Sequence, residues 1–480
     1  MTPMPATRPL SAPLWTAAEA AKAVSGSCSG TWNATGISID SRTVAAGDLF
    51  VALKGPSFDG HRFVVQALKK GAAGAIVHEA VPESAEYHDR LIVVKDTFLA
   101  LENLARAARA RTGAKIIAVT GSVGKTGTKE ALKLALAVQG ATHATEGNLN
   151  NHWGVPLSLA RMPAATQFGV FELGMNHPGE IAPLSKLVRP HAAVITTVEA
   201  AHLEFFASVA EIADEKAAIM AGLEPGGIAV LPSDNPHFAR LMANAKRYGA
   251  KTVAFGTGGD ATARLFAWSL TPDGTQVAAE FDNERIMYDM IVSGRHWALN
   301  SIAAIAAVKA IGGNIHLAAA ALARLAAPVG RGARKRIRVS GGKALLIDES
   351  YNASPAAVRV LADTLAQMHQ PVGGALGKDG GRLIMVLGDM RELGTKAAEL
   401  HAGLAESLQS ARIDLVYTAG PMMKHLHDAL PEKMRGAHAA DSVALARILQ
   451  ADLRKDDVVA VKGSHASRMD LVVEALGAME

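Results

Sequence analysis

The chain has 480 residues, more than the roughly 250 to 300 that one hydrophobic core usually serves, so two or three domains are expected. With 49% hydrophobic and 20% charged residues, its composition is typical of a globular protein and excludes a disordered chain. The formal net charge is only +4 and the basic residues are spread along the chain, so nucleic acid is not expected as a partner.

The cysteine content and the start of the chain point to a cytoplasmic protein. The single cysteine, Cys28, cannot form a disulfide within the chain. The first residues lack the charged start and apolar core of a secretion signal, and no apolar run is long enough to span a membrane. We therefore expect a cytoplasmic location and no membrane span.

Residues 1–112 have the pattern of a small α/β domain. Apolar runs at 48–53 and 75–77 predict strands, and residues 63–70 predict a helix between them, with glycines at the joins. Residues 113–328 then alternate apolar runs with helical stretches, the rhythm of a mostly parallel sheet with crossover helices. The predicted strands of this central domain are residues 116–119, 168–172, 193–198, 228–231 and 253–255.

The helical pattern breaks at residues 328–332, and a third predicted domain, residues 329–480, follows. The glycine-rich stretch 372–381 within it predicts a surface loop. Its predicted strands alternate with helices as in a second open, Rossmann-like sheet, and they are residues 344–347, 383–387, 415–418 and 458–461. The expected fold class is therefore α/β, with three domains.

Residues 120–128, with the sequence TGSVGKTGT, are the most informative motif of the chain. They follow a predicted strand and precede a helix predicted over residues 128–138, which is the setting of a phosphate-binding loop. Backbone amides of such a loop close on phosphate oxygens, while Lys125 supplies positive charge and Thr126 offers a hydroxyl to Mg²⁺. Val119 stands at the first glycine of the usual pattern, and Gly121 takes over its role. The predicted nucleotide-binding residues are Gly121, Ser122, Val123, Gly124, Lys125, Thr126 and Gly127.

Two further residues follow the ends of predicted strands, where open α/β sheets bind their ligands. Glu172 ends the strand 168–172, and its carboxylate could hold Mg²⁺ opposite the Thr126 hydroxyl; a capping or salt-bridged glutamate would look the same in the sequence. His202 follows the strand 193–198 and could ligate a second metal ion or orient a phosphate, although a turn histidine needs no ligand.

Lys216 lies on the apolar stripe of a helix predicted over residues 208–223. One interpretation is that its long stem is buried while its ammonium group reaches water. The other is that burial lowers its pKa, so that a neutral amine binds a substrate or takes up CO₂ as a carbamate, which reverses the charge and makes the side chain a metal ligand. The sequence leaves both interpretations open.

Further motifs occur in a fixed order along almost the whole chain. They are SIDSR at 38–42, TGSVGKT at 120–126, GNLNNHWGVPL at 147–157, ELGMN at 172–176, AHLE at 201–204, IDESYNASP at 347–355, VLGDMRELG at 386–394 and VKGS at 461–464. Together they resemble the Mur ligase family. Lys216 falls where that family has its carbamylated lysine.

The resemblance implies an ATP-dependent amide ligase with three domains. Residues 1–112 would bind the UDP end of a substrate, residues 113–328 would form a P-loop ATPase domain, and residues 329–480 would close on ATP and bind an incoming dipeptide. The motifs at 347–355 and 386–394 are similar to those of the branch that joins D-alanyl-D-alanine to UDP-N-acetylmuramoyl-tripeptide, through an acyl phosphate, in peptidoglycan precursor synthesis. A monomer is expected.

The same likeness implies roles for individual residues. Lys125, His202 and Lys216 would be catalytic; Thr126 and Glu172 would hold one Mg²⁺ ion, and His202 with carbamylated Lys216 a second. Asn300 would meet the adenine, and Arg331 and Asp348 would reach the ATP from the C-terminal domain, although Arg331 also belongs to a basic run, 331–338, typical of a solvated face. The implied substrate-binding residues are Ser41, Arg42, Asn151 and Asn352.

Other classes of protein would share part of this pattern. A phosphotransferase or nucleotide switch needs the loop at 120–128 but has no use for Glu172, His202 and Lys216 together, and a binding protein that only keeps the fold would not need them at all. A sister ligase that adds a single amino acid is a nearer alternative, which the segment 351–355 disfavours. Departures from the family pattern occur at Thr196, Thr197, Ala218, Trp297, Glu349, Ser354 and His465.

Overall fold

The structure is a computed structural model that describes residues 12–55, 58–79, 82–201, 203–271, 274–368 and 381–479. The chain divides into two compact units. The first unit comprises Met1–Lys115, Ala141–Phe171 and Lys186–Val188, and the second Ile116–Gly140, Glu172–Ser185 and Arg189–Glu480. Within the described ranges, no helix combines the length and the apolar composition needed to cross a membrane.

The first unit contains a four-stranded parallel sheet of order β3-β4-β5-β6, whose strands are Gly36–Ser38, Asp48–Val51, Gly74–Val77 and Leu91–Val93. A short antiparallel pair is formed by β1 (Trp15–Thr16) and β2 (Asn33–Ala34). The strand β8 (Thr142–Ala144) and most of its parallel partner β9 (Phe168–Glu172) also lie here. The helices of this unit are α1 (Ala17–Val24), α2 (Val64–Lys69), α3 (Thr97–Ala110) and α5 (Gly154–Ala160), with 3-10 helices at Gly60–Phe63 and Pro82–Arg90.

Helices α3 and α5 both contribute buried residues to a hydrophobic core of the first unit. Asp96 begins α3 by accepting hydrogen bonds from the backbone N–H groups of Phe98 and Leu99, as an N-cap residue does. Leu101 and Leu104 of α3 are fully buried in one cluster with Leu157 of α5. Residues far apart in the sequence therefore share this core.

In the second unit, seven strands are consecutive neighbours in the order β15-β14-β13-β12-β11-β10-β7. The strands from β7 to β13 pair in parallel, and β13, β14 and β15 are antiparallel. Their bounds are β7 (Lys115–Thr120), β10 (Ala192–Ile195), β11 (Ile228–Pro232), β12 (Lys251–Gly256), β13 (Ala263–Thr271), β14 (Gly274–Phe281) and β15 (Glu284–Met290).

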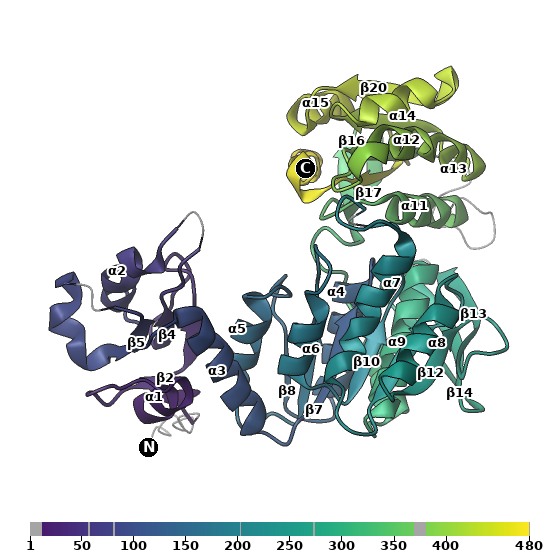
Figure 1. The fold of residues 1–480 in the computed structure, drawn as a ribbon. Helices are drawn as coiled ribbons and strands as arrows, with labels where there is room; N and C mark the ends of the chain where they lie inside the picture. The colour runs from purple at the N-terminus through teal and green to yellow at the C-terminus, as the bar shows by residue number, and fades with distance from the viewer. Residues whose placement is uncertain are drawn as a thin grey trace, which may run out of the picture. The chain divides into compact units, whose positions relative to one another are not determined.

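Helices accompany this sheet, as the alternating sequence pattern predicts. Helix α9 packs along β10 to β14, and α8 packs along β11 and β12 (Figure 1). The helices are α4 (Lys125–Ala137), α6 (Ile181–Val188), α7 (Val209–Ala217), α8 (Phe238–Arg247), α9 (Arg295–Ala310) and α10 (Ile315–Leu322), with a 3-10 helix at Ala218–Gly222.

The last part of the second unit contains a six-stranded sheet of order β16-β17-β21-β18-β19-β20. Only β16 is antiparallel to its neighbour. The strands are β16 (Ala333–Val339), β17 (Gly342–Glu349), β18 (Leu383–Gly388), β19 (Leu415–Ala419), β20 (Arg435–Ala439) and β21 (Val458–Lys462). The helices are α11 (Pro355–Met368), α12 (Ala397–Ala402), α13 (Leu404–Ser410), α14 (Met423–Ala429), α15 (Ser442–Asp452) and α16 (Asp470–Gly477), with 3-10 helices at Gly394–Lys396, Glu432–Met434 and His465–Ser467.

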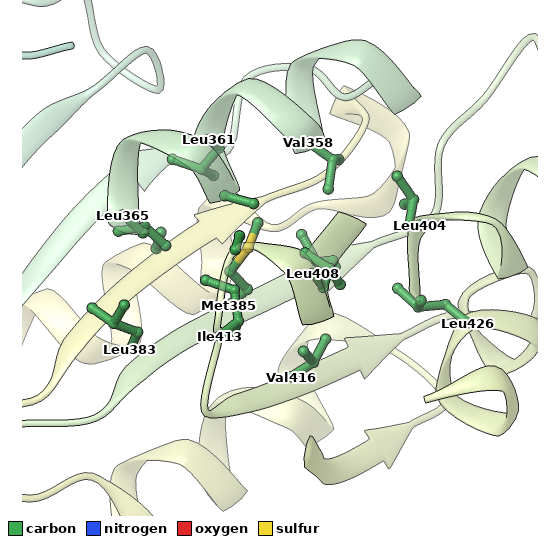
Figure 2. Packing of buried hydrophobic residues seen from close by; sticks show 14 of the residues in the cluster. Val358, Leu361, Leu365, Leu383, Met385, Leu404, Leu408, Ile413, Val416 and Leu426 are labelled. Carbon is green, nitrogen blue, oxygen red and sulfur yellow. The ribbon is translucent and has the colours of Figure 1, made fainter. Parts of the chain in front are cut away.

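The six-stranded sheet is covered on both faces by apolar clusters. On one face, α11 directs Val358, Leu361 and Leu365 toward Met385 of β18 and Leu408 of α13 (Figure 2). Met385 and Leu408 are fully buried. A parallel sheet buried on both faces positions a ligand site at the carboxyl ends of its strands.

The structure differs from the predicted elements mainly at their ends. The strand predicted over 193–198 ends at Ile195, and Thr196 instead donates a hydrogen bond to the carbonyl of Val123, 2.6 Å away. The helix predicted over 208–223 is α-helical only to Ala217 and continues as a 3-10 helix. The predicted surface loop 372–381 lies, except for its last residue, outside the described residues.

Candidate active site

The predicted phosphate-binding loop forms the turn between β7 and α4. Helix α4 begins at Lys125 rather than at Thr128, so the predicted start was wrong by three residues. The reason is Gly124, the N-cap residue, whose φ of 89° turns the chain directly into the helix. The backbone N–H groups of the first helical turn therefore begin within the loop itself, where they can meet phosphate oxygens.

Two glycines let other segments of the same chain approach the loop closely. Gly121 has a φ of 149°, and a Cβ atom there would lie 1.9 Å from the hydroxyl of Thr196. A Cβ atom on Gly124 would lie 2.8 Å from the side-chain nitrogen of Asn300. The structure thus brings Asn300, predicted to contact adenine, against the phosphate loop.

The charged and hydroxyl groups of the loop converge at its centre. The Lys125 ammonium group donates to the carbonyl of Gly121 at 2.8 Å, and so turns back across the loop. The Thr126 hydroxyl donates to a carboxylate oxygen of Glu172 at 2.9 Å. Thr126 and Glu172 are only 8% and 1% exposed. A buried hydroxyl and carboxylate beside a phosphate loop are a ligand pair suited to Mg²⁺, so the residues present fit the predicted ion.

Lys216 is buried along its whole length, with 2% of its surface exposed. Its ammonium nitrogen lies 3.9 Å from the sulfur of Met175, a weak acceptor. The interpretation in which the ammonium group reaches water is therefore wrong for this structure. Burial lowers the pKa of Lys216 well below its ordinary value, and the charge of Lys125 lowers it further.

Positive charge gathers around the loop. Burial also lowers the pKa of Lys125, the carboxylate of Glu172 opposes this shift, and the positive charge of Arg331 adds to it. Lys125 thus interacts electrostatically with two other basic side chains, those of Lys216 and Arg331. Such a cluster is suited to polyphosphate, whose negative charges it would offset.

His202, predicted to be catalytic and to bind metal, lies outside the described residues. Among the residues that are described, no three His, Cys, Asp or Glu side chains gather closely enough to hold a metal ion. The backbone N–H of Glu204, two residues further on, donates to the carbonyl of Glu392 at 3.2 Å. The chain just after His202 therefore contacts the loop that follows β18.

Asp348, near the end of β17, contacts the turn that contains Arg331. One carboxylate oxygen of Asp348 accepts from the backbone N–H of Gly330 at 3.0 Å, and the other accepts from the hydroxyl of Ser350 at 2.6 Å. The guanidinium carbon of Arg331 lies 4.1 Å from the centroid of the Tyr351 ring. Asp348 thus holds the turn that carries Arg331.

A cavity of about 540 Å³ opens beside the loop, a size typical of small-ligand sites. Its lining joins Val123 and Gly124 of the loop to Asn300 of α9 and to Glu349 and Lys462 of the six-stranded sheet. Glu349 and Lys462 form an ion pair at 3.2 Å. The space can accept the nucleoside part of a nucleotide whose phosphates lie in the loop.

Sequence reasoning did not single out Glu199, which also lines this cavity. The backbone N–H of Glu199 donates to the hydroxyl of Ser122 at 2.9 Å, and that hydroxyl donates to the Glu199 carbonyl at 3.0 Å. Its carboxylate accepts from the hydroxyl of Thr197 at 3.2 Å, and burial raises its pKa. Its position directly after the predicted strand 193–198 was the signal that could have found it.

The predicted substrate residues occupy local structural positions. Ser41 is buried, while the side chain of Arg42 is 87% exposed and pairs with Asp40. The side-chain oxygen of Asn151 accepts from the backbone N–H of Gly154 at 2.8 Å, at the start of α5. These three belong to the first unit, whereas Asn352 lies exposed in the second. Their predicted contacts with substrate stay predictions.

Fold and site together define a nucleotide-binding α/β protein with a variant phosphate loop and a second α/β sheet. Three family models match the chain: "Mur ligase family, catalytic domain" over residues 33–109, "Mur ligase middle domain" over 119–308, and "Mur ligase, glutamate ligase domain" over 335–465. The chain therefore belongs to the Mur ligase family.

Relatives named UDP-N-acetylmuramoyl-tripeptide--D-alanyl-D-alanine ligase match almost end to end. The protein of Escherichia coli (strain K12) is 35% identical over 92% of this chain and 93% of its own length. The protein of Bacillus subtilis (strain 168) is 33% identical, with the same shares covered.

Solved structures of the same kind share the fold. A crystal structure of MurF from Acinetobacter baumannii has a TM-score of 0.83 at 29% identity, covering 96% of this chain and 98% of the other. The MurF ligase of Thermotoga maritima in complex with ADP has a TM-score of 0.76 at 29% identity, covering 92% and 96%. These matches confirm the predicted family and fold class, while the domain boundaries at 112 and 328 stay predictions.

Proposed function

We propose that this chain is an ATP-dependent amide ligase that joins D-alanyl-D-alanine to UDP-N-acetylmuramoyl-tripeptide in cytoplasmic peptidoglycan precursor synthesis. The substrates follow from the relatives that carry this activity in their names and match 92% of the chain. The proposed reaction class rests on one observation. The buried Thr126–Glu172 pair lies beside a phosphate loop where the basic side chains of Lys125 and Arg331 interact.

The first step activates a carboxylate. A carboxylate oxygen of the tripeptide attacks the γ-phosphorus of ATP, an oxygen–phosphorus bond forms, and the bond to the bridging oxygen breaks as ADP leaves. Two anions have to approach each other for this attack. Lys125 and Arg331 offset their charges, and such electrostatic contacts are typically worth about 10² to 10³ in rate each.

The second step forms the amide. The amine nitrogen of D-alanyl-D-alanine attacks the acyl carbon, the bond to the phosphate oxygen breaks, and inorganic phosphate leaves. The nitrogen gives up its proton as the amide forms. Asn352 is exposed in the segment after β17 and is assigned to this peptide end of the site, while Ser41, Arg42 and Asn151 are assigned to the UDP-linked substrate.

Two Mg²⁺ ions fit this chemistry, since they would screen the phosphate and carboxylate charges. Thr126 and Glu172 would hold the ion nearer the phosphates. His202 and Lys216 are assigned to the other, with Lys216 carrying a carbamate. Burial favours the neutral amine, and a neutral amine can add to CO₂, forming a nitrogen–carbon bond and releasing a proton, which leaves an anionic oxygen ligand.

The test is the release of inorganic phosphate from ATP with UDP-N-acetylmuramoyl-tripeptide and a panel of amines. We expect release only when both substrates are present, with the highest kcat/KM for D-alanyl-D-alanine over L-alanyl-L-alanine, D-alanine and a diamino acid. The product should gain the mass of the dipeptide minus water. A Lys125→Met variant is the negative control, and its rate of phosphate release should fall by about 10² to 10³.

Two outcomes would contradict the proposal. Phosphate release at an equal rate without an acceptor amine would indicate a nucleotide switch. Preference for a single amino acid would indicate a sister ligase. Size-exclusion chromatography with light scattering tests the proposed monomer, which should have the chain mass of 49.9 kDa.

A further inference from the structure

The Arg331 side chain lies on an aromatic ring. Its guanidinium carbon is 4.1 Å from the centroid of Tyr351, well inside the distance for a cation–π contact. Within the described part of the chain, no carboxylate forms an ion pair with Arg331. The ring is thus the contact that orients this guanidinium group.

The backbone around Arg331 is held independently of that contact. Gly330 donates to the Asp348 carboxylate at 3.0 Å, and Gly332 donates to the Asp348 carbonyl at 2.7 Å. The backbone N–H of Tyr351 in turn donates to the carbonyl of Gly330 at 3.1 Å. The main chain on both sides of Arg331 is therefore fixed, while its long side chain would stay free to rotate without the ring.

The ring itself is well supported. A Cβ atom on Gly330 would lie 2.8 Å from the Cβ of Tyr351, so the two segments are in close backbone contact. His465 meets the Tyr351 ring edge-on, with ring centroids 6.2 Å apart. Tyr351 is thus a fixed surface against which a mobile cation can be placed.

The orientation matters because the segment of Arg331 lies beside the phosphate loop that carries Lys125. A Cβ atom on Gly332, the next residue, would lie 3.6 Å from the indole nitrogen of Trp297, and a Cβ atom on Gly127 of the loop would lie 2.8 Å from the same indole ring. Repulsion would drive a free arginine side chain away from Lys125 whenever no phosphate lies between them. Stacking on Tyr351 opposes that movement.

We propose that Tyr351 is a positioning residue, whose ring holds the Arg331 guanidinium toward the phosphate loop before ATP arrives. The inference rests on the proposed function, because it assigns Arg331 to the phosphates of ATP. Tyr351 does not touch the reacting atoms; it acts by reducing the freedom that Arg331 would lose on meeting them.

The experiment compares Tyr351→Phe, which keeps the aromatic face, with Tyr351→Leu, which removes it, in the wild-type and Arg331→Met backgrounds. Loss of a cation–π contact corresponds to a fall of about 2- to 30-fold in kcat/KM for ATP in Tyr351→Leu. Tyr351→Phe should stay within about twofold of wild type. In the Arg331→Met background, Tyr351→Leu should change the rate by less than about twofold, because the partner is already gone.

A second readout does not depend on ligation. The aromatic ring current should shift the side-chain protons of Arg331 upfield in NMR spectra of arginine-labelled protein. This shift should persist in Tyr351→Phe and vanish in Tyr351→Leu, with Arg331→Met assigning the resonance.

The outcomes separate this inference from the proposed function. If the wild type ligates but Tyr351→Leu is as active, or if the effects of Tyr351→Leu and Arg331→Met multiply independently, the positioning role is wrong and the proposed function stands. A Tyr351→Phe variant as impaired as Tyr351→Leu would assign the role to the hydroxyl instead. If the wild type does not ligate, the proposed function fails, and the NMR shift still decides whether the stack exists.

Discussion

Lys216 shows how burial changes the chemistry of a single side chain. An ammonium group surrounded by apolar atoms is costly, because water no longer solvates its charge. The neutral amine is the less costly form, and it is also the form that reacts with CO₂. The burial that makes this position unfavourable for a charged lysine therefore also favours the reactive, neutral form of its amine.

Replacing Lys216 with alanine should abolish ligation while ATP binding is spared, since Lys125 and the loop amides remain. The loss of one electrostatic contact to the reacting groups is worth on the order of 10² to 10³ in rate. Phosphate-release kinetics and binding of a fluorescent ATP analogue measure the two effects. Wild-type activity should also depend on bicarbonate in carefully degassed buffer.

The matched control is Lys246→Ala, which removes an exposed lysine from α8. It should leave both ligation and ATP binding unchanged. Full activity of Lys216→Ala would remove this lysine from the metal site, and bicarbonate-independent activity of the wild type would argue against the carbamate.

His401 is a buried histidine in its neutral form. One ring nitrogen accepts from the backbone N–H of Met390 at 3.0 Å, and the other contacts the carbonyl of Ala397 at 2.6 Å. Burial lowers the pKa of His401, although the nearby carbonyl and Asp389 oppose the shift. Protonation would remove the acceptor that Met390 needs.

The free energy of unfolding should therefore fall as the pH drops below about 6.5, the ordinary pKa of histidine. Below that pH the unfolded chain binds a proton that folded His401 does not, and the loss continues down to the lowered pKa. Above it both states are neutral and His401 adds no slope. Urea unfolding at several pH values measures this, and His401→Gln should reduce the dependence whereas the exposed His88→Gln should not.

At the scale of elements, the first turn of α4 depends on a helix packed against it. A Cβ atom on Gly127 would lie 2.8 Å from a ring carbon of Trp297, at the start of α9. Trp297 is 5% exposed, so its indole has little room to move. The close approach of α9 therefore gives a reason for a glycine at position 127, in addition to its predicted place in the phosphate-binding loop.

Gly127→Ala should destabilise the protein by about 1 to 3 kcal/mol, the usual cost of overpacking. In an exposed helix the same change would stabilise by about 1 kcal/mol, so the sign of the effect identifies the contact. Urea unfolding measures it. In a Trp297→Ala background, Gly127→Ala should become neutral or stabilising.

Gly113→Ala serves as the control, because a Cβ atom there would meet nothing within 4 Å. It should leave the unfolding midpoint nearly unchanged. Equal destabilisation by Gly127→Ala with and without Trp297 would show that the helix contact does not matter.

At the scale of the whole molecule, the first compact unit needs residues from beyond the predicted boundary at 112. The indole N–H of Trp15 donates to the carbonyl of Ala160 at 2.9 Å, and Arg111 donates to that of Met162 at 3.1 Å. Leu157 also belongs to the core that contains Trp15. Residues 141–171 thus complete the core of this unit.

A fragment of residues 1–112 should therefore be less stable than a fragment of residues 1–171. Removing Leu157 and its neighbours exposes apolar surface, worth roughly 25 cal/mol per Å². Urea unfolding followed by circular dichroism, with binding of a hydrophobic dye, compares the two. An equal and cooperative transition for both fragments would show that residues 113–171 are not needed.

Most parallel strands could be predicted because each is a short buried run bounded by turns. The antiparallel strands β13, β14 and β15 were not predicted, since exposed and half-buried residues interrupt their buried ones and dilute the apolar signal. The family and the phosphate loop were recognisable because their chemistry requires particular residues in order. Trp297 was noticed only as a departure from the family pattern, and its contact with Gly127 could not be predicted.

Local sequence was enough for the α/β class, the phosphate loop and the candidate residues Lys125, Thr126 and Glu172, because glycine turns and strand ends act over a few residues. Only the folded chain showed that Lys216 is buried, that Thr126 meets Glu172, and that Arg331 lies on Tyr351. Burial and charge interactions depend on what packs around a side chain, and those neighbours come from segments far away in the sequence.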